Sequence, residues 1–134
     1  MPFVIDASVA ATWLLPDEGH PVAIAAYERL LSDHAVAPSL WWFEMRNIFI
    51  SNERRGRLDG EKTNRALALL TELPIQFDYT PDSAALLELA RRHRLTAYDA
   101  AYLELAQRLD LPLASLDREL CAAAAAVGVE LIRA

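Results

Sequence analysis

The chain opens with the stretch Phe3-Val4-Ile5-Asp6-Ala7-Ser8, in which three apolar residues run directly into a carboxylate, and this stretch decides the kind of fold that follows. We expect Phe3 to Asp6 to form a short buried strand. Residues 8–15 should then form a helix that Pro16 ends. A strand that leads straight into a helix is the unit from which layered α/β folds are built.

Short apolar runs alternate with segments of helical spacing along the rest of the chain. Further strands are expected over residues 35–37, 75–79, 111–116 and 129–132. Further helices are expected over residues 21–32, 40–55, 60–72, 81–93, 97–109 and 118–127, with Ser39, Thr80 and Thr96 as candidate N-caps. The alternation predicts an α/β fold with a mostly parallel central sheet flanked by helices, in a single domain over residues 1–134.

The composition narrows the class of protein further. The hydrophobic fraction is 54% and the mean hydropathy is +0.12, an apolar surplus that favours a homodimer or a partner protein. A net charge of −6 argues against a large non-specific nucleic-acid surface. No segment approaches the roughly 20 apolar residues of a membrane helix. With no basic leader and a single cysteine, Cys121, the expected location is the cytoplasm.

Four carboxylates stand where folding alone does not require them: Asp6, Glu44, Asp99 and Asp117. Asp6 and Asp117 each end a predicted strand, and parallel sheets bind ligands beyond the carboxyl ends of their strands. Glu44 is embedded in an aromatic and aliphatic run, and Asp99 opens a predicted helix. Because buried carboxylates are costly unless a positive group meets them, the set predicts a site for hard cations and therefore phosphate chemistry.

Each acid also has a plain structural explanation. Asp6 and Asp117 can cap the helices that follow them. Asp99 fits the third helical position of a capping box and is favoured there by the helix dipole. Glu44 can face water or pair with Arg46, although residues two apart on a helix do not face each other.

The chemistry expected of the four acids is phosphodiester hydrolysis. Mg²⁺ or Mn²⁺ relieves the repulsion between neighbouring carboxylates and supplies an activated water. Asn47, one turn after Glu44, can orient a water or a ligand. Ser8 and Ser115 can donate hydrogen bonds to carboxylates. A zinc cluster, a glycine-rich phosphate loop and a serine–histidine triad find no matching pattern in the sequence.

The chain resembles the PIN-domain ribonucleases, in particular the VapC toxins of bacterial type II toxin–antitoxin modules. The matching pieces, in order, are Val4-Ile5-Asp6-Ala7-Ser8, Glu44-Met45-Arg46-Asn47, Thr96-Ala97-Tyr98-Asp99-Ala100-Ala101-Tyr102 and Leu113-Ala114-Ser115-Leu116-Asp117. The resemblance implies a PIN-like three-layer sandwich, cleavage of RNA with Mg²⁺ or Mn²⁺, a homodimer, and inhibition by a small VapB-like antitoxin that occupies the site. It also implies that the metal-binding acids are Asp6, Asp99, Glu44 and Asp117.

Two other functions stay open on the sequence alone: a housekeeping PIN nuclease in RNA processing, and a catalytically silent acidic-pocket binding module. A receiver-type signalling domain would need a lysine after a late strand, whereas the only lysine, Lys62, lies in a predicted helix. A haloacid-dehalogenase phosphatase would need an aspartate where Ser8 stands.

Two groups of residues near the predicted helix over residues 40–55 have undecided roles. Trp41 and Trp42 point different ways on a helix, so we expect unequal burial, and one of them can line a groove or stack on a base. Arg54, Arg55 and Arg57 can track an RNA backbone or complement the helix carboxyl end.

Overall fold

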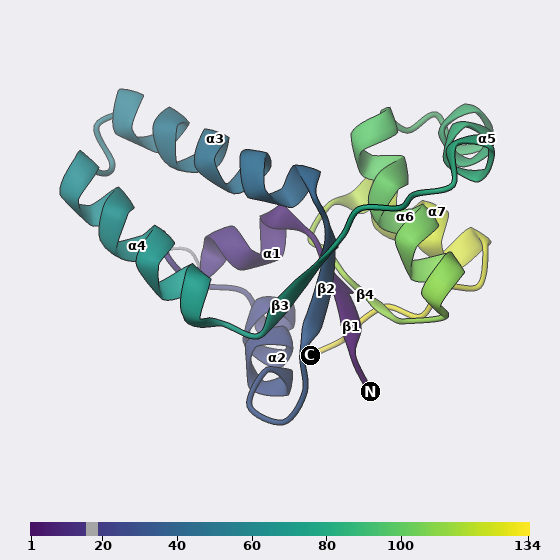
Figure 1. Ribbon diagram of the computed structural model, residues 1–134, viewed down its shortest axis with the longest axis horizontal. Helices are drawn as coiled ribbons and strands as arrows, with labels where there is room; N and C mark the ends of the chain where they lie inside the picture. Colours follow the sequence, from purple (N-terminus) through teal and green to yellow (C-terminus); the bar gives the residue numbers. More distant parts are fainter. Residues whose placement is uncertain (16–18) are drawn as a thin grey trace.

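A four-stranded parallel sheet forms the centre of the protein (Figure 1), in a computed structural model that describes residues 1–15 and 19–134. The sheet has the strand order β3-β2-β1-β4. Its strands are β1 (Phe3–Ile5), β2 (Ala35–Pro38), β3 (Ile75–Asp78) and β4 (Leu113–Ala114). Pro16, the predicted end of the first helix, lies outside the described residues.

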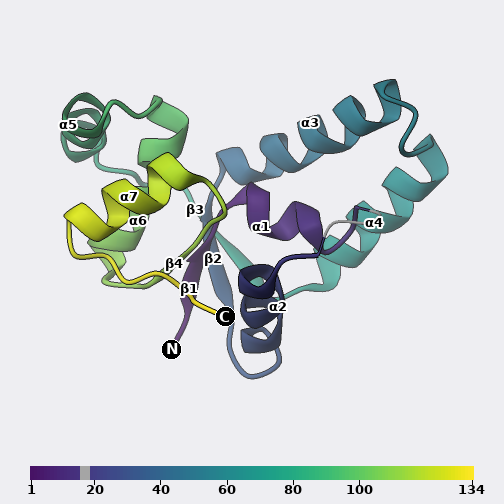
Figure 2. The same cartoon turned by 180° about the vertical axis from the view of Figure 1, so that it is seen from behind.

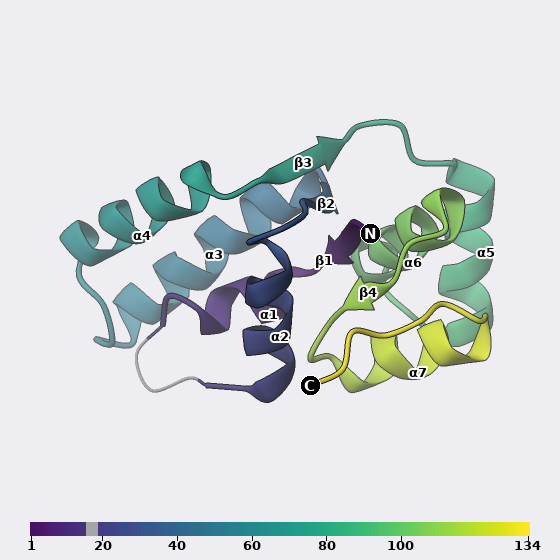
Figure 3. The ribbon, with the colours of Figure 1, turned by 90° about the horizontal axis from the view of Figure 1, so that it is seen from below.

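Helices cover both faces of this sheet. They are α1 (Ala7–Thr12), α2 (Pro21–Arg29), α3 (Leu40–Arg54), α4 (Gly60–Glu72), α5 (Ser83–His93), α6 (Ala97–Leu109) and α7 (Arg118–Ala126). Helices α5, α6 and α7 gather on one side, and α1 to α4 lie on the other (Figures 1 and 2). Seen from below, α3 and α4 extend together away from the sheet (Figure 3). This arrangement confirms the predicted α/β three-layer fold.

The opening strand lies at the centre of the molecule. Phe3, Val4 and Ile5 are all fully buried, because β1 has a strand on each side and helices on both faces. A strand in that position is apolar throughout and does not alternate. From β1 the chain builds outward through β2 to β3 and then crosses to β4 on the opposite side of β1. The crossing creates a switch point between the carboxyl ends of β1 and β4, where open parallel sheets bind ligands.

Two predicted N-caps and one predicted helix start were wrong. Ser39 has helical backbone angles (φ −58°, ψ −25°) and makes no side-chain capping bond. Helix α5 starts after Asp82, whose Oδ1 accepts from the Ala85 N–H at 3.1 Å. Thr80 does not cap it, because its N–H and hydroxyl both turn back to the carboxylate of Asp78.

The last two predicted strands are shorter than expected. The strand predicted over residues 111–116 is regular only over Leu113–Ala114, because Ser115 bends away to bond other groups. The strand predicted over residues 129–132 reduces to one bridge between Leu131 and Leu113. In the part of the chain that the structure describes, no helix is both long and apolar enough to cross a membrane.

Candidate active site

Asp6 is the buried centre of the site, with 5% of its surface exposed. It follows β1 directly and caps α1, since its Oδ1 accepts from the Val9 N–H at 3.1 Å. The same oxygen accepts from the Ser8 hydroxyl at 2.7 Å, and the Ser115 hydroxyl donates to Oδ2. Burial raises the pKa of Asp6, the hydrogen bonds oppose that rise, and the charge of Asp117 adds to it.

The two serines also join the beginning of the chain to its end. The Leu116 N–H donates to the Ser8 hydroxyl oxygen at 3.0 Å, and the Asp117 N–H donates to that of Ser115 at 3.0 Å. These bonds fix the segment after β4 against the first turn of α1. The serines predicted to support the carboxylates therefore contact Asp6 and hold Asp117 in place through its backbone.

Asp117 is half-buried and has the capping role that the sequence allows. Its Oδ1 accepts from the Leu120 N–H at 2.9 Å, at the start of α7. One carboxylate oxygen thus fixes the helix, and the other accepts no hydrogen bond from the described residues. The cap holds the charge in place beside Asp6.

Glu44 lies half-buried on α3 and accepts a hydrogen bond from the Tyr102 hydroxyl of α6. Burial raises the pKa of Glu44; the hydrogen bond opposes that rise, and the charges of Asp99 and Asp6 increase it. Arg46 does not pair with Glu44. Its guanidinium stacks 3.5 Å from the centroid of Trp42 and donates to the Trp42 carbonyl at 3.1 Å.

Glu44 and Asn47 both lie outside the buried stripe of α3, which consists of Trp41, Met45, Phe49 and Asn52. Glu44 lies beside that stripe, where its carboxylate reaches the carboxyl end of the sheet. Asn47 is exposed one turn further on, and among the described residues it bonds none of the acids.

Asp99 is half-buried in the first turn of α6. Thr96 is the N-cap of this helix, as predicted, because its hydroxyl oxygen accepts from the Asp99 N–H at 3.1 Å. Burial raises the pKa of Asp99, and the charges of Asp117 and Glu119 raise it further. Glu119 is an acid near the site that the sequence analysis missed; it lies only two residues after Asp117.

The four acids converge from distant parts of the chain. The charge of Asp117 contributes to the raised pKa of both Asp6 and Asp99. The charges of Asp99 and Asp6 contribute to the raised pKa of Glu44. Each of the four acids therefore interacts electrostatically with two of the others, close to the switch point of the sheet. None of the four has an ion-pair partner among the described residues.

This set of donors fits a hard divalent cation. The groups are all oxygen ligands, and their mutual repulsion is not neutralised by the described protein residues. Within residues 1–15 and 19–134, no three acidic, imidazole or thiol groups stand close enough to enclose an ion by themselves. A divalent cation held by one or two carboxylates, with waters completing its coordination, would fit that arrangement.

Comparison with known proteins shows the family to which the chain belongs. A model of the PIN domain matches residues 3–126. Ribonuclease VapC3 of Pyrobaculum aerophilum is 32% identical over 124 residues, covering 90% of this chain and 92% of the relative. The chain belongs to the VapC family of PIN-domain ribonucleases. The predicted family is therefore confirmed, and PIN-domain ribonucleases generally use divalent metals.

Solved structures support the fold. A second Pyrobaculum aerophilum protein has a crystal structure that superposes with a TM-score of 0.70 at 24% identity, over 92% of this chain and 84% of that one. A toxin–antitoxin complex from Klebsiella pneumoniae contains a chain with a TM-score of 0.61 at 15% identity, covering 86% of each chain.

The residues with undecided roles separate in the structure of this VapC-family chain. Trp41 is buried against Phe77, with ring centroids 5.8 Å apart, whereas 44% of Trp42 is exposed, so their predicted unequal burial is confirmed. Arg54 and Arg55 are exposed at the end of α3, while Arg57 donates to the Asn52 side chain at 3.1 Å.

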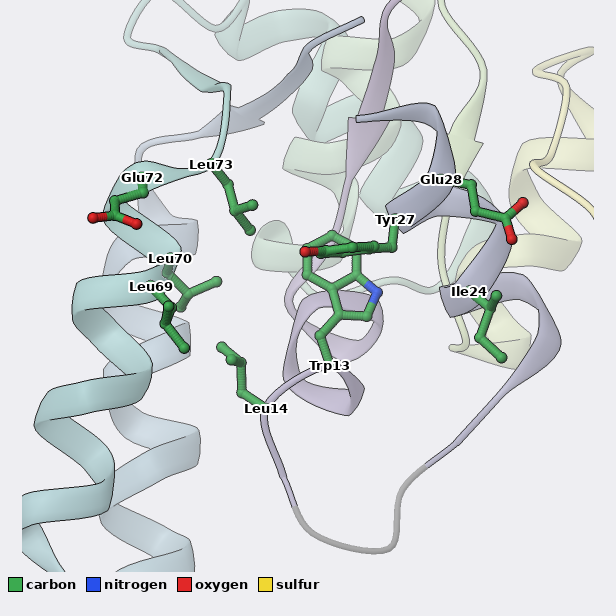
Figure 4. Close-up of a pocket in the computed structure, with 9 residues that line it drawn as sticks. All are labelled: Trp13, Leu14, Ile24, Tyr27, Glu28, Leu69, Leu70, Glu72 and Leu73. Atoms are coloured by element: carbon green, nitrogen blue, oxygen red, sulfur yellow. The ribbon is translucent and has the colours of Figure 1, made fainter. Parts of the chain in front are cut away.

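A concave surface away from the four acids, the α1–α2–α4 groove, has a volume of about 660 Å³ (Figure 4). It is lined by Trp13, Leu14, Ile24, Tyr27, Glu28, Leu69, Leu70, Glu72 and Leu73. Trp13 is fixed there by a 2.8 Å hydrogen bond from its Nε1 to the Ala23 carbonyl and by edge contact with Tyr27. None of the four acids lines this groove.

Proposed function

We propose that this protein is the toxin of a type II toxin–antitoxin module and that it hydrolyses phosphodiester bonds in cytoplasmic RNA with Mg²⁺ or Mn²⁺. The class of reaction, endoribonucleolytic cleavage by a toxin, follows from its family. The observation that carries the proposal is the convergence of four mutually repelling carboxylates near the switch point of the sheet.

In this proposal, Asp6 and Asp99 are the principal metal ligands, and Glu44 and Asp117 complete the set. Ser8 and Ser115 fix the Asp6 carboxylate by donating to its two oxygens. When bound, the metal would polarise the scissile phosphate and lower the pKa of an attacking water. Asn47 is exposed one turn after Glu44 on α3, and we propose that it contacts the RNA or orients a water.

Cleavage of RNA with and without divalent metal tests this function. Asp6→Asn and Asp99→Asn should each lower the cleavage rate by about 100-fold or more, since several kcal/mol of charge stabilisation are lost. Asp82→Asn is a matched control, because it changes a capping aspartate of α5 outside the site. Activity of Asp99→Asn at the wild-type level, or absence of metal-dependent cleavage by the wild type, would contradict the proposal.

The partner that we propose is a VapB-like antitoxin, one segment of which lies in the α1–α2–α4 groove. The groove offers exposed apolar side chains, with 56% of both Ile24 and Leu69 accessible, and it bears the carboxylates of Glu28 and Glu72. An amphipathic segment with apolar anchors and flanking lysine or arginine residues complements that lining.

Binding to the antitoxin encoded next to the toxin gene tests the groove. Leu69→Asp should weaken the complex by at least about tenfold in calorimetry, because it places a charge among the apolar contacts. Leu87→Asp is the control, since Leu87 is an exposed leucine of α5 outside the groove. Equal affinity of Leu69→Asp and wild type would place the antitoxin elsewhere.

The two alternative functions make different predictions. A housekeeping nuclease would cut RNA but would have no antitoxin reading frame immediately beside its gene. A silent binding module would bind metal without cutting RNA. Examination of the neighbouring reading frame, together with the cleavage assay, separates these possibilities.

A further inference from the structure

Tyr102 is a buried tyrosine whose only polar atom points at the site. It is 2% exposed and is among the largest fully buried side chains of the described chain. A buried phenol needs a hydrogen-bond partner. The partner here is Oε1 of Glu44, 58 residues away in sequence. Hydrogen bonds to an ionised acceptor are stronger than neutral ones, so this contact constrains the carboxylate as well as the tyrosine.

The bond joins the two helices that supply metal-ligand candidates. Asp99 and Tyr102 are three apart on α6 and therefore share a face of the helix. Glu44 projects from α3 on the other side of the sheet's carboxyl edge. The hydroxyl of Tyr102 thus sets the separation between the Glu44 carboxylate and Asp99 of α6. Packing alone would leave the Glu44 side chain flexible.

Glutamate has three rotatable side-chain bonds, and Glu44 is only half-buried. Burial alone therefore does not fix its carboxylate. Tyr102 holds Oε1, while Oε2 accepts no hydrogen bond from the described residues. One oxygen is anchored in the protein, and the other is left for a ligand. Outer groups that orient a metal ligand in this way commonly affect affinity by 10- to 100-fold.

We propose that Tyr102 is a positioning residue, which aims the free oxygen of Glu44 at the divalent cation and so sets the metal affinity of the site. The inference rests on the proposed function for the identity of the bound group. The phenol itself contacts neither the metal nor the RNA; it acts through Glu44.

Titration with Mn²⁺ alone, followed by electron paramagnetic resonance of the free ion, tests the proposal without RNA. Tyr102→Phe keeps the ring and removes only the hydroxyl. It should weaken Mn²⁺ binding by about tenfold while melting as a cooperative, folded protein. Tyr98→Phe is the matched control: it removes a hydroxyl from a 66% exposed tyrosine of the same helix and should bind Mn²⁺ as the wild type does.

A double-mutant cycle shows whether the effect passes through Glu44. In a Glu44→Gln background, Tyr102→Phe should change Mn²⁺ affinity by less than about twofold, because the group that it positions has lost its charge. A full tenfold loss in that background, wild-type affinity of Tyr102→Phe, or no Mn²⁺ binding by the wild type would each overturn the proposal. If Tyr102→Phe fails to fold, Glu44→Asp alone decides the question, because the shorter side chain withdraws the carboxylate from the phenol. It should weaken Mn²⁺ binding by about tenfold, and wild-type affinity of Glu44→Asp would overturn the proposal.

Parallel cleavage assays keep this proposal separate from the function. Should Mn²⁺ binding follow the expected cycle while no form of the protein cuts RNA, the positioning role stands and the nuclease proposal fails. Should the wild type and Tyr102→Phe cut RNA and bind Mn²⁺ equally well, the nuclease proposal stands and the positioning role fails.

Discussion

A single carboxylate can both cap a helix and serve a catalytic site. Asp6 and Asp117 accept the N–H groups of Val9 and Leu120, as ordinary N-caps do. Each nevertheless belongs to the group of mutually repelling carboxylates near the switch point. The cap orders the backbone around the carboxylate and thereby fixes the position of its charge. Asparagine also caps helices well, so Asp→Asn variants remove the charge while retaining the cap.

The raised pKa of Asp99 predicts a measurable effect on stability. An acid whose folded-state pKa exceeds its unfolded value favours folding below the unfolded pKa, and this contribution is lost as pH rises through the folded pKa. In metal-free buffer at pH 7, Asp99→Asn should therefore raise the melting temperature by about 2–4 °C. The gain should shrink as the pH falls from 7 towards 4, because the folded-state carboxyl of Asp99, whose pKa is raised, takes up its proton first.

Thermal unfolding followed by circular dichroism between pH 4 and pH 8 measures this difference. Addition of Mn²⁺ should reverse it, because the ion stabilises the charged wild-type site and not the amide. A lower melting temperature for Asp99→Asn than for wild type at pH 7 without metal would contradict this prediction. It would show that burial and the repulsion from Asp117 and Glu119 do not destabilise the charged Asp99.

The sequence identifies the four acids better than their surroundings. Asp6 and Asp117 could be found because each follows an apolar strand directly. Tyr102 could not, since its partner is 58 residues away and the contact depends on how α3 and α6 are placed around the sheet. The alternative of a Glu44–Arg46 pair, which helix geometry disfavours, does not form, because the guanidinium of Arg46 stacks on the exposed Trp42 ring instead.

At the scale of helices and strands, local signals decide most of the boundaries. Helix α6 spans the predicted residues because a threonine cap starts it and Asp110, in a left-handed conformation, ends it. Helix α5 starts later than predicted because Asp82, and not Thr80, accepts the capping hydrogen bond. The length of β4 depends on bonds from Ser115 to residues far away in sequence, which no local pattern contains.

The unequal roles of Thr96 and Ser39 give a prediction for these helix starts. Thr96→Ala removes the acceptor for the Asp99 N–H and should cost about 1 kcal/mol of unfolding free energy. Ser39→Ala should change it by less than about 0.5 kcal/mol, because Ser39 makes no capping bond. Urea titrations with unchanged slopes measure both values. Equal losses for the two variants would contradict the assignment of caps.

At the scale of the whole molecule, the topology brings the acids of the site together, and the negative charge opposes the binding of phosphates. The crossing from β3 to β4 brings the carboxyl ends of β1 and β4 together, so residues more than 100 positions apart become neighbours. The protein is acidic overall, with a net charge of −6, and its site repels the phosphates that it is proposed to cut. A bound divalent cation reverses the local sign, which links metal occupancy to the attraction of RNA.

The outer surface supports the proposed homodimer through one aromatic patch, made of Trp42, Phe43 and Tyr79. These side chains are 44%, 69% and 72% exposed, and together with Ser39 and Phe77 they line one shallow depression between the start of α3 and the end of β3. A twofold axis through the patch would bury both copies of each of these side chains. Burying one phenylalanine side chain stabilises the assembly by about 2 kcal/mol.

Replacing Phe43, a 69% exposed ring of the patch, tests this assembly. If the wild type is a dimer, Phe43→Glu should make it monomeric at the same concentration, because a twofold axis would bring two carboxylates together in the patch. Light scattering coupled to gel filtration measures the mass directly. Leu31→Glu, at an 81% exposed position beyond α2, is the matched control and should keep the wild-type mass. If Phe43→Glu remains a dimer, the aromatic patch is not the contact between the two copies, and a monomeric wild type at the same concentration would remove the need for one.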